Sequence, residues 1–400
     1  MILWLNKMKR LIFIFSCVLS CLVSCQDYSP DTHIPDGGLI YLSASVNENM
    51  LTRSPYYSSE SASEGFSCPT TKHPLNVDVW GSTDAYTFKH IEEGGKVLDG
   101  SGENGKVSIH TDACFTSGQP QLLRAAIYSK TTKPDVYFVS FHPMSQDGEK
   151  WTDNAGVSAS YTFNGNDDVM FAPQVSGKYA QDYEASPVLS FHHLLTWLRV
   201  EIKAESKEVS DSWGKITGMK ITSKNTVKID LSASAYDSDG SYKFEDSIQY
   251  SGEAKFNFYS TVEEESYVGS QVTLEKKFTD DVFPGSEGAE IPYLQSEELA
   301  YVLCAPVDAE ETMVSDGKDV PAPEYYIEIT TEKRSVTVPV DLLKAENEPF
   351  LGSTRCYQFN LRLNFKMGNT VYVTTSISDW QVGGIIFGEL GDSDLNKRCI

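Results

Sequence analysis

Three glycines and a lysine could form a phosphate-binding loop. Gly100, Gly102 and Gly105 have the spacing G-x-G-x-x-G. Lys106 follows them directly. Such a loop binds phosphate when a helix begins behind it, and a P-loop also needs a hydroxyl side chain after the lysine to bind magnesium. Val107 occupies that position, and no long helical pattern follows. We therefore interpret this segment as the flexible tip of a hairpin.

Two further groups of polar residues could bind a metal ion. His192 and His193 are adjacent, so on a strand they point to opposite faces and cannot chelate one ion together. The run from Asp237 to Gly240 begins like a calcium loop but lacks the later ligands and the final glutamate of an EF-hand. The chain also contains no zinc-ligand spacing, nucleophile elbow or metalloprotease motif. We expect no catalytic residue, no metal site, no cofactor and no enzyme activity.

The N-terminus carries a cysteine whose thiol could be alkylated by lipid. Residues 1–25 begin with basic side chains at positions 7, 9 and 10, and continue as an apolar run that is too short to span a bilayer. The run ends in Leu22-Val-Ser-Cys25, which resembles the lipobox of bacterial lipoproteins. The resemblance implies a lipoprotein signal peptide over residues 1–25 and acyl chains on Cys25. An ordinary secretory leader is the alternative, and Cys21 is a poorer second candidate for acylation.

Composition limits the partners and the size of the fold. The net charge of the 400-residue chain is −23, which argues against binding to nucleic acid or to an anionic membrane surface. Four hundred residues are too many for one ordinary hydrophobic core, so we expect two domains. The 21 tyrosines and 19 phenylalanines favour strands.

Short strands separated by turn residues recur along the chain after residue 37. The clearest lies within residues 186–203, where apolar residues alternate with Arg199, Glu201 and Lys203. Strands are also predicted at residues 38–46, 75–80, 121–129, 135–141, 159–163, 215–223, 226–231, 254–260, 270–274, 299–305, 324–330, 335–340, 356–365, 370–376 and 384–387. Met367-Gly-Asn369 predicts a tight hairpin between two of them.

This spacing of short strands favours an all-β fold made of two tandem β-sandwich domains. We expect a tether over residues 26–37, an N-terminal sandwich over residues 38–186 and a C-terminal sandwich over residues 187–400. Residues 47–67 are rich in serine and glutamate, and they contain Arg53 and Ser54. We expect this connection to be exposed and easily cut by proteases.

The order of these features resembles the fimbrillin proteins of Bacteroidales, the subunits of type V pili. No single motif is diagnostic, and the resemblance depends on their succession along most of the exported chain. The matching segments are the lipobox at Cys25, the Thr52-Arg53 loop, Val79-Trp80-Gly81, the run that begins at Pro187, an apparent hairpin over residues 216–231, residues 355–363, and Ile377-Ser-Asp-Trp380 with Gly383-Gly384.

The resemblance implies two transthyretin-like β-sandwiches and a structural or adhesive subunit of a fimbrium at the cell surface, exported as a lipoprotein to the outer membrane. It also implies assembly by strand exchange after a trypsin-like protease removes the first strand, which here places the cut between Arg53 and Ser54. Residues 385–387 of a neighbouring subunit could then fill the vacated position. The implied partners are other fimbrial subunits, whether further copies or minor pilins, the outer membrane through the lipid, and a ligand on a host or bacterial surface.

A second class of function is a surface glycan-binding lipoprotein, or a pilus anchor or tip protein that escapes proteolytic processing. A glycan binder would present a planar aromatic patch, for which Trp151 and Trp213 are candidates. A fimbrial subunit would instead have a long apolar groove beneath the strand at residues 38–46. The two alternatives are therefore separated by where these side chains lie.

Overall fold

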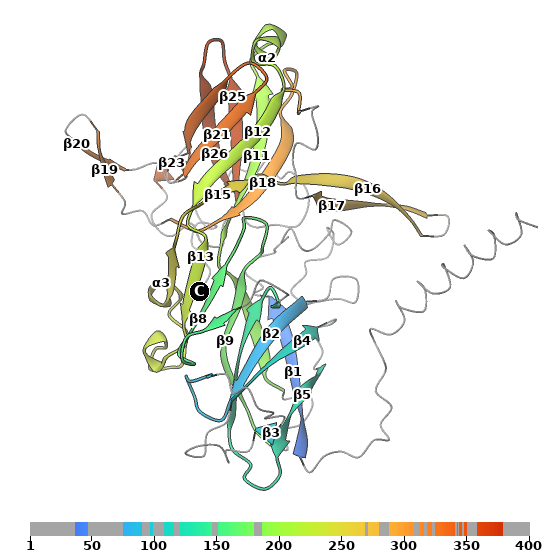
Figure 1. The fold of residues 1–400 in the computed structure, drawn as a ribbon, viewed down its shortest axis with the longest axis vertical. Helices are drawn as coiled ribbons and strands as arrows, with labels where there is room; N and C mark the ends of the chain where they lie inside the picture. Colours follow the sequence, from blue (N-terminus) through green and yellow to red (C-terminus); the bar gives the residue numbers. More distant parts are fainter. Residues whose placement is uncertain are drawn as a thin grey trace, which may run out of the picture. The chain divides into compact units, whose positions relative to one another are not determined.

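The computed structural model describes residues 37–46, 75–89, 97–98, 108–115, 121–145, 151–179, 186–268, 271–279, 288–307, 312–315, 318–321, 325–340, 342, 344–345, 348–349 and 358–378. These residues form mostly strands, with three short helical segments (Figure 1). The all-β prediction is therefore confirmed. The helical segments are α2 (Lys207–Trp213), η4 (Ala233–Ala235) and α3 (Phe244–Ser247).

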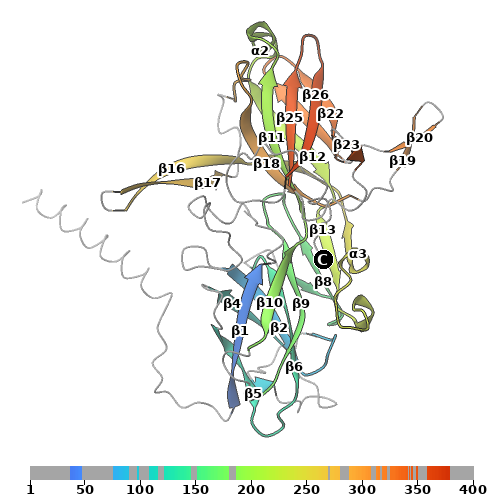
Figure 2. The ribbon, with the colours of Figure 1, turned by 180° about the vertical axis from the view of Figure 1, so that it is seen from behind.

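An eight-stranded sheet contains the first described strand, β1, in its interior. Its order is β3-β5-β1-β10-β9-β6-β2-β4. Figure 2 shows β1 beside β10. The strands are β1 (Gly37–Val46), β2 (Leu75–Ser82), β3 (Val97–Leu98), β4 (Ser108–Phe115), β5 (Gln121–Ser129), β6 (Val136–His142), β9 (Met170–Gly177) and β10 (Val188–His193).

Three four-stranded sheets hold most of the remaining strands. The first has the order β18-β11-β25-β26, the second β15-β12-β21-β22, and the third β14-β13-β8-β7. Their bounds are β7 (Thr152–Asp153), β8 (Ser158–Thr162), β11 (Thr196–Ala204), β12 (Ile216–Ser223), β13 (Thr226–Asp230), β14 (Ile248–Ser251), β15 (Ala254–Asn257), β18 (Glu297–Cys304), β21 (Tyr325–Thr331), β22 (Ser335–Val340), β25 (Gln358–Phe365) and β26 (Val371–Ser378).

Three two-stranded ribbons complete the described strands. They are formed by β16 (Ser260–Val268) with β17 (Gln271–Thr279), β19 (Thr312–Ser315) with β20 (Lys318–Pro321), and β23 (Lys344–Ala345) with β24 (Glu348–Pro349). The pairing is antiparallel in each ribbon.

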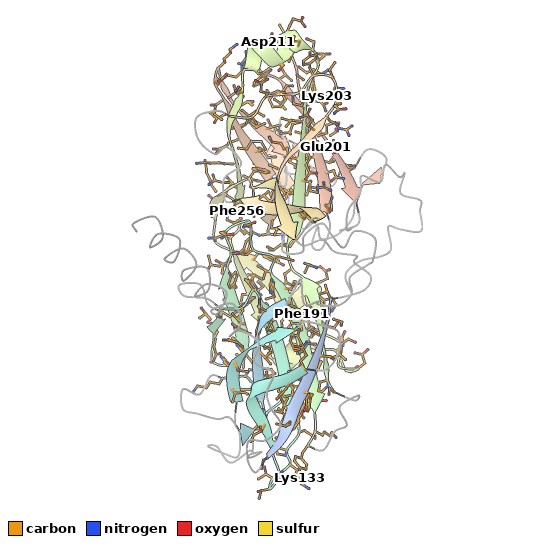
Figure 3. All side chains as sticks on the ribbon, turned by 90° about the vertical axis from the view of Figure 1, so that its right-hand side faces the viewer. Lys133, Phe191, Glu201, Lys203, Asp211 and Phe256 are labelled. Carbon is orange, nitrogen blue, oxygen red and sulfur yellow. The ribbon has the colours of Figure 1, made fainter. Side chains whose placement is uncertain are left out.

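The alternation predicted around residue 200 is present in β11. Leu198, Val200 and Ile202 are buried on one face, while Arg199, Glu201 and Lys203 alternate with them and are partly exposed. Figure 3 shows Glu201 and Lys203 on this strand. The strand lies antiparallel to β18 and parallel to β25. The face of Leu198, Val200 and Ile202 packs in the core, which explains why it is apolar apart from Thr196 at its start.

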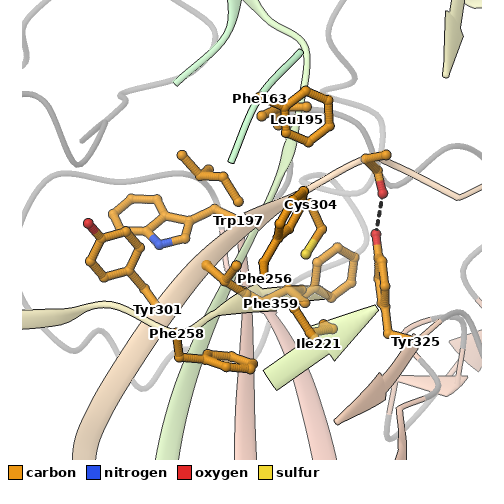
Figure 4. Close-up of a cluster of buried hydrophobic side chains, with 14 of the residues drawn as sticks. Phe163, Leu195, Trp197, Ile221, Phe256, Phe258, Tyr301, Cys304, Tyr325 and Phe359 are labelled. Carbon is orange, nitrogen blue, oxygen red and sulfur yellow. Dashed lines mark hydrogen bonds between the residues drawn. The ribbon is translucent and has the colours of Figure 1, made fainter. Parts of the chain in front are cut away.

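Below this alternating strand, aromatic and aliphatic side chains from several sheets form a shared core (Figure 4). Trp197 packs edge-on against Tyr301, and Phe163 contacts Phe256. The hydroxyl of Tyr325 donates a hydrogen bond to the carbonyl oxygen of Ala305 at 2.5 Å, so this buried polar group is satisfied.

The turn predicted at Met367–Asn369 is confirmed. β25 and β26 pair antiparallel from Gln358↔Ser378 to Phe365↔Val371. The backbone N–H of Lys366 donates to the carbonyl of Thr370 at 3.0 Å, and Gly368 has a φ of +81°. Only glycine adopts this left-handed conformation without strain.

The hairpin expected over residues 216–231 is wrong. Both predicted strands form, as β12 and β13, but β12 pairs with β15 and β21 whereas β13 pairs with β8 and β14. The two residues between them therefore carry the chain from one sheet into another. The sequence pattern fixes which residues are extended, but the pairing depends on partners that are distant along the chain.

The predicted boundary at Pro187 lies directly before β10, which pairs with β1 and β9 of the eight-stranded sheet. The chain reaches the next sheet only at Thr196, where β11 begins. The division into two sandwich domains remains a prediction.

The β1 slot as candidate functional site

β1 is enclosed by neighbouring strands on both sides. It lies between β5 and β10 in the sheet order. Against β10 it runs parallel, with the pairs Ser43↔Val188, Ala44↔Leu189, Ser45↔Ser190 and Val46↔Phe191. The backbone N–H of Ser43 also donates to the carbonyl of Pro187 at 3.0 Å. We call the space that this strand fills, bounded by β5, β10 and the core beneath, the β1 slot.

One face of β1 is part of a hydrophobic core. Ile40, Leu42, Ala44 and Val46 are each at most 4% exposed. They belong to a cluster with Val77, Phe138, Leu189, Phe191 and other apolar residues of β2, β6, β9 and β10. Burial of each large aliphatic side chain contributes about 1.5–3 kcal/mol relative to exposure. The slot is therefore apolar along most of its length, and loss of β1 would expose it.

The opposite face of β1 is uncharged and partly open to solvent. Leu39 is 37% exposed, and Val188 on the neighbouring strand is 50% exposed. Ser43 is buried, and its hydroxyl donates to the carbonyl oxygen of Pro187 at 3.5 Å. The strand is consequently held by its backbone, by its core face and, on the opposite face, by the hydroxyl of Ser43.

A buried hydrogen-bonded pair of side chains lies at the far end of β10. Nδ1 of His193 donates to Oδ1 of Asp168 at 2.7 Å, and both side chains are at most 2% exposed. His142 at the end of β6 is also buried, and its Nδ1 donates to the carbonyl oxygen of Asn76 at 2.8 Å. Burial lowers the pKa of His142. Hydrogen bonds from buried histidines to fixed acceptors on other segments suit a structural role.

His192 points to the face opposite His193, as predicted. Its ring packs against Phe244 with a centroid distance of 4.4 Å. Burial, with a smaller contribution from neighbouring His193, lowers the pKa of His192 to about 4. The two adjacent histidines therefore serve two different contacts. Sequence analysis missed Asp168 and His142, because these residues lie far from His193 along the chain and carry no local motif.

The other predicted sites fall into two groups. The turn from Asp237 to Gly240 is closed by backbone hydrogen bonds, and the Asp239 carboxylate accepts from the N–H of Ser241. Within the residues that the structure describes, no three His, Cys, Asp or Glu side chains are placed to hold a metal ion. Cys25, Arg53, Ser54, the glycine loop at 100–106 and residues 385–387 lie outside the described residues.

The aromatic patch expected of a glycan binder at Trp151 and Trp213 is wrong. Trp151 is 6% exposed and Trp213 is fully buried. The indole N–H of Trp213 donates to the carbonyl oxygen of Lys366 at 2.8 Å, and Arg334 lies over its ring at 4.5 Å. Both tryptophans are core residues, so neither can stack on a sugar at the surface.

The fold and the slot define a β-rich structural protein in which the first described strand completes a sheet interior. A family model described as "Fimbrillin-like" matches residues 79–283. The chain therefore belongs to the fimbrillin-like family. Its members are structural proteins, and this chain is a fimbrial or adhesive subunit and not an enzyme. Such a subunit is located at the cell surface or in a fimbrium.

Solved structures are similar to this chain at low sequence identity. A candidate cell adhesion protein from Bacteroides uniformis is 12% identical, with a TM-score of 0.41, and the match covers 87% of this chain and 100% of that one. The fimbrial anchor protein Mfa2 from Porphyromonas gingivalis is 10% identical, with a TM-score of 0.36 and coverage of 86% and 99%. The tip fimbrial protein Mfa3 of the same organism is 12% identical, with a TM-score of 0.33 and coverage of 86% and 100%. A search of curated proteins gave no match.

None of the helices within the described residues combines the length and the apolar character needed to cross a bilayer.

Proposed function

We propose that this subunit is exported as a lipoprotein acylated at Cys25 and that it joins other subunits by strand exchange at the β1 slot. The observation that carries the proposal is the position of β1. The strand is embedded between β5 and β10, yet it is the first strand the structure describes, and only residues 47–74 connect it to β2. A single cut in that connection would free it from the rest of the fold.

The proposed cut lies between Arg53 and Ser54. Arginine suits a trypsin-like protease, and the connection is rich in serine and glutamate. After cleavage, β1 would be retained only by contacts such as its backbone pairing, the burial of Ile40, Leu42, Ala44 and Val46, and the hydrogen bond from the Ser43 hydroxyl. These contacts are non-covalent, so a competing strand could replace them.

Residues 385–387 of a second copy are the proposed replacement strand. They are apolar, as the slot requires, and they lie near the end of the chain. An empty slot would expose backbone groups of β5 and β10 together with core side chains, which favours addition of a strand from another molecule. Acyl chains on Cys25 would place the precursor at the outer membrane before the cut.

The test is cleavage of the purified exported chain with trypsin, followed by electrophoresis in SDS without heating. We expect a ladder of SDS-resistant oligomers. Lys72 in the same connection is a second trypsin site, so both chains also carry Lys72→Gln. The Arg53→Ala variant of that chain is the matched control and should stay monomeric. Oligomers that form equally in the control would contradict processing at Arg53. Complete cleavage at Arg53 that yields only monomers would contradict strand exchange and favour an anchor or tip role.

A further inference from the structure

At the start of the β1 slot, any residue larger than glycine would force a tyrosine ring to move. A Cβ atom added to Gly38 would lie 2.8 Å and 2.9 Å from Cε2 and Cδ2 of the Tyr179 ring. Real Cβ atoms essentially never approach other atoms this closely. On another side, the Cβ of Tyr128 would be 3.8 Å away, which is ordinary contact. Gly38 thus lies between two tyrosines from different parts of the sheet.

Tyr128 is a core residue, and Tyr179 packs against the same core from a partly buried position. Tyr128 is 4% exposed and belongs to the same core cluster as Ile40 and Leu42. Tyr179 packs against that cluster, and the ammonium group of Lys133 lies 5.0 Å from its ring centroid. A second glycine, Gly177, leaves space for the Tyr128 hydroxyl. We call this arrangement of Tyr128 and Tyr179 the tyrosine gate.

The apolar face of β1 does not by itself determine the register of the strand in the slot. A slip of one residue would turn Ile40, Leu42, Ala44 and Val46 away from the core, but a slip of two would keep them facing it. In that slipped register Ile40 or residue 36 would lie at the gate instead of Gly38. We propose that the tyrosine gate favours glycine over every residue with a side chain and thereby sets the register of any strand that fills the slot.

The same requirement identifies the register of an incoming strand. In β1, Gly38 is followed by an aliphatic residue two positions later and another four positions later. The same pattern, with Val, Ile or Leu at the first position and Val, Ile, Leu or Phe at the second, occurs at Gly38, Gly105 and Gly383. The Gly105 match leads into β4 of the same sheet. The Gly383 match contains Ile385 and Phe387. A second copy would therefore insert with Gly383 at the gate, Ile385 in place of Ile40 and Phe387 in place of Leu42. This step rests on the proposed strand exchange.

The gate is tested first in the full chain, where no exchange is needed. Gly38→Ala should lower the melting midpoint by about 3 °C, because it forces the Tyr179 ring to move. Gly218→Ala is the matched control, since its nearest neighbour is the Thr330 Cβ at 3.8 Å, and it should not lower the midpoint. Adding Tyr179→Ala should remove most of the loss caused by Gly38→Ala. A Gly38→Ala chain as stable as the parent would overturn the gate, as would a loss that Tyr179→Ala leaves unchanged.

Exchange is tested separately with peptides. The full chain, cut at a specific protease site inserted within residues 47–74, is incubated with labelled peptides of residues 37–46 or 382–390. Valine at position 38 or 383 should weaken incorporation at least about tenfold, and Tyr179→Ala should restore it. Incorporation that is insensitive to valine would overturn the gate as a selector of strands. If even the unaltered peptides never enter, strand exchange fails, while the melting experiment still decides the register of β1.

Discussion

β1 and β11 are built alike but are held differently. Each lies inside a sheet, and each runs parallel to one neighbour, β10 for β1 and β25 for β11. Each buries alternate apolar residues on one face. The outer face of β11, however, carries ion pairs that join Arg199 to Glu298 and Glu201 to Arg362. β1 has no charged residue at all.

The chain connections of the two strands differ as well. β11 continues into β10 on one side and α2 on the other, so removal of β11 would require two cuts through the folded region. β1 requires one. Burial is therefore the same in both strands. In the proposed exchange, β1 differs from β11 by the single cut that would free it and by an outer face free of side-chain ion pairs.

The largest expected effect comes from truncating a buried leucine in each strand, and it distinguishes β1 from β11. Leu42→Ala in β1 and Leu198→Ala in β11 each remove a fully buried side chain, and each should lower the free energy of unfolding by about 2–5 kcal/mol. Denaturant titration of the full chain measures both. In chains cut within residues 47–74, only Leu42→Ala should speed the release of β1. Gel filtration measures this release. Equal release from the Leu198→Ala chain would remove the distinction.

A second prediction uses acid to weaken the wall of the slot. His192 on β10 has a pKa lowered to about 4, whereas β25 contains no histidine. At a pH below 6.5, the ordinary pKa of histidine, His192 takes up a proton in the unfolded chain but stays neutral in the folded chain. Stability should therefore fall by about 2–3 kcal/mol as the pH drops from 6.5 to 4, and then level off for this group.

Two other buried groups of the same sheet, His142 on β6 and Asp78 on β2, affect that titration. His142, whose pKa is also lowered, acts in the same direction, whereas burial raises the pKa of Asp78 and acts in the opposite one. His192→Phe keeps a ring beside Phe244 and isolates the contribution of His192. Urea midpoints measured from pH 7 to pH 4 should decline less steeply in this variant. Identical slopes in the variant and the parent would show that His192 does not weaken the wall.

Sequence predicted the strands with strong alternation and missed those without it. β1 and β11 were found because period-two patterns are local. β4 was missed because its sequence, Ser-Ile-His-Thr-Asp-Ala-Cys-Phe, is mostly polar, and it is an edge strand with one neighbour. β9 was missed because Pro173 and Gln174 interrupt its pattern.

The site was predictable only in part. The apolar face of β1 follows from the residues themselves, but its parallel pairing with β10 joins segments more than 140 residues apart in the chain, as in the contact of Ser43 with Pro187. The tyrosine gate likewise depends on Tyr128 and Tyr179 meeting at Gly38. No local sequence pattern predicts this contact, because the topology of the sheet brings the residues together.

The smallest expected effect concerns the charges that β1 lacks. Nε and Nη2 of Arg362 donate to Oε2 of Glu201 at 3.2 and 3.0 Å, but the arginine side chain is 41% exposed, so water weakens the pair. Glu201→Gln should therefore lower the free energy of unfolding by no more than about 1 kcal/mol, and the loss should shrink in high salt. Glu253→Gln at an exposed position outside any helix or strand is the control and should change neither value. A Glu201→Gln loss that persists at 1 M salt would mean that packing of the side chain, and not its charge, holds the outer face of β11.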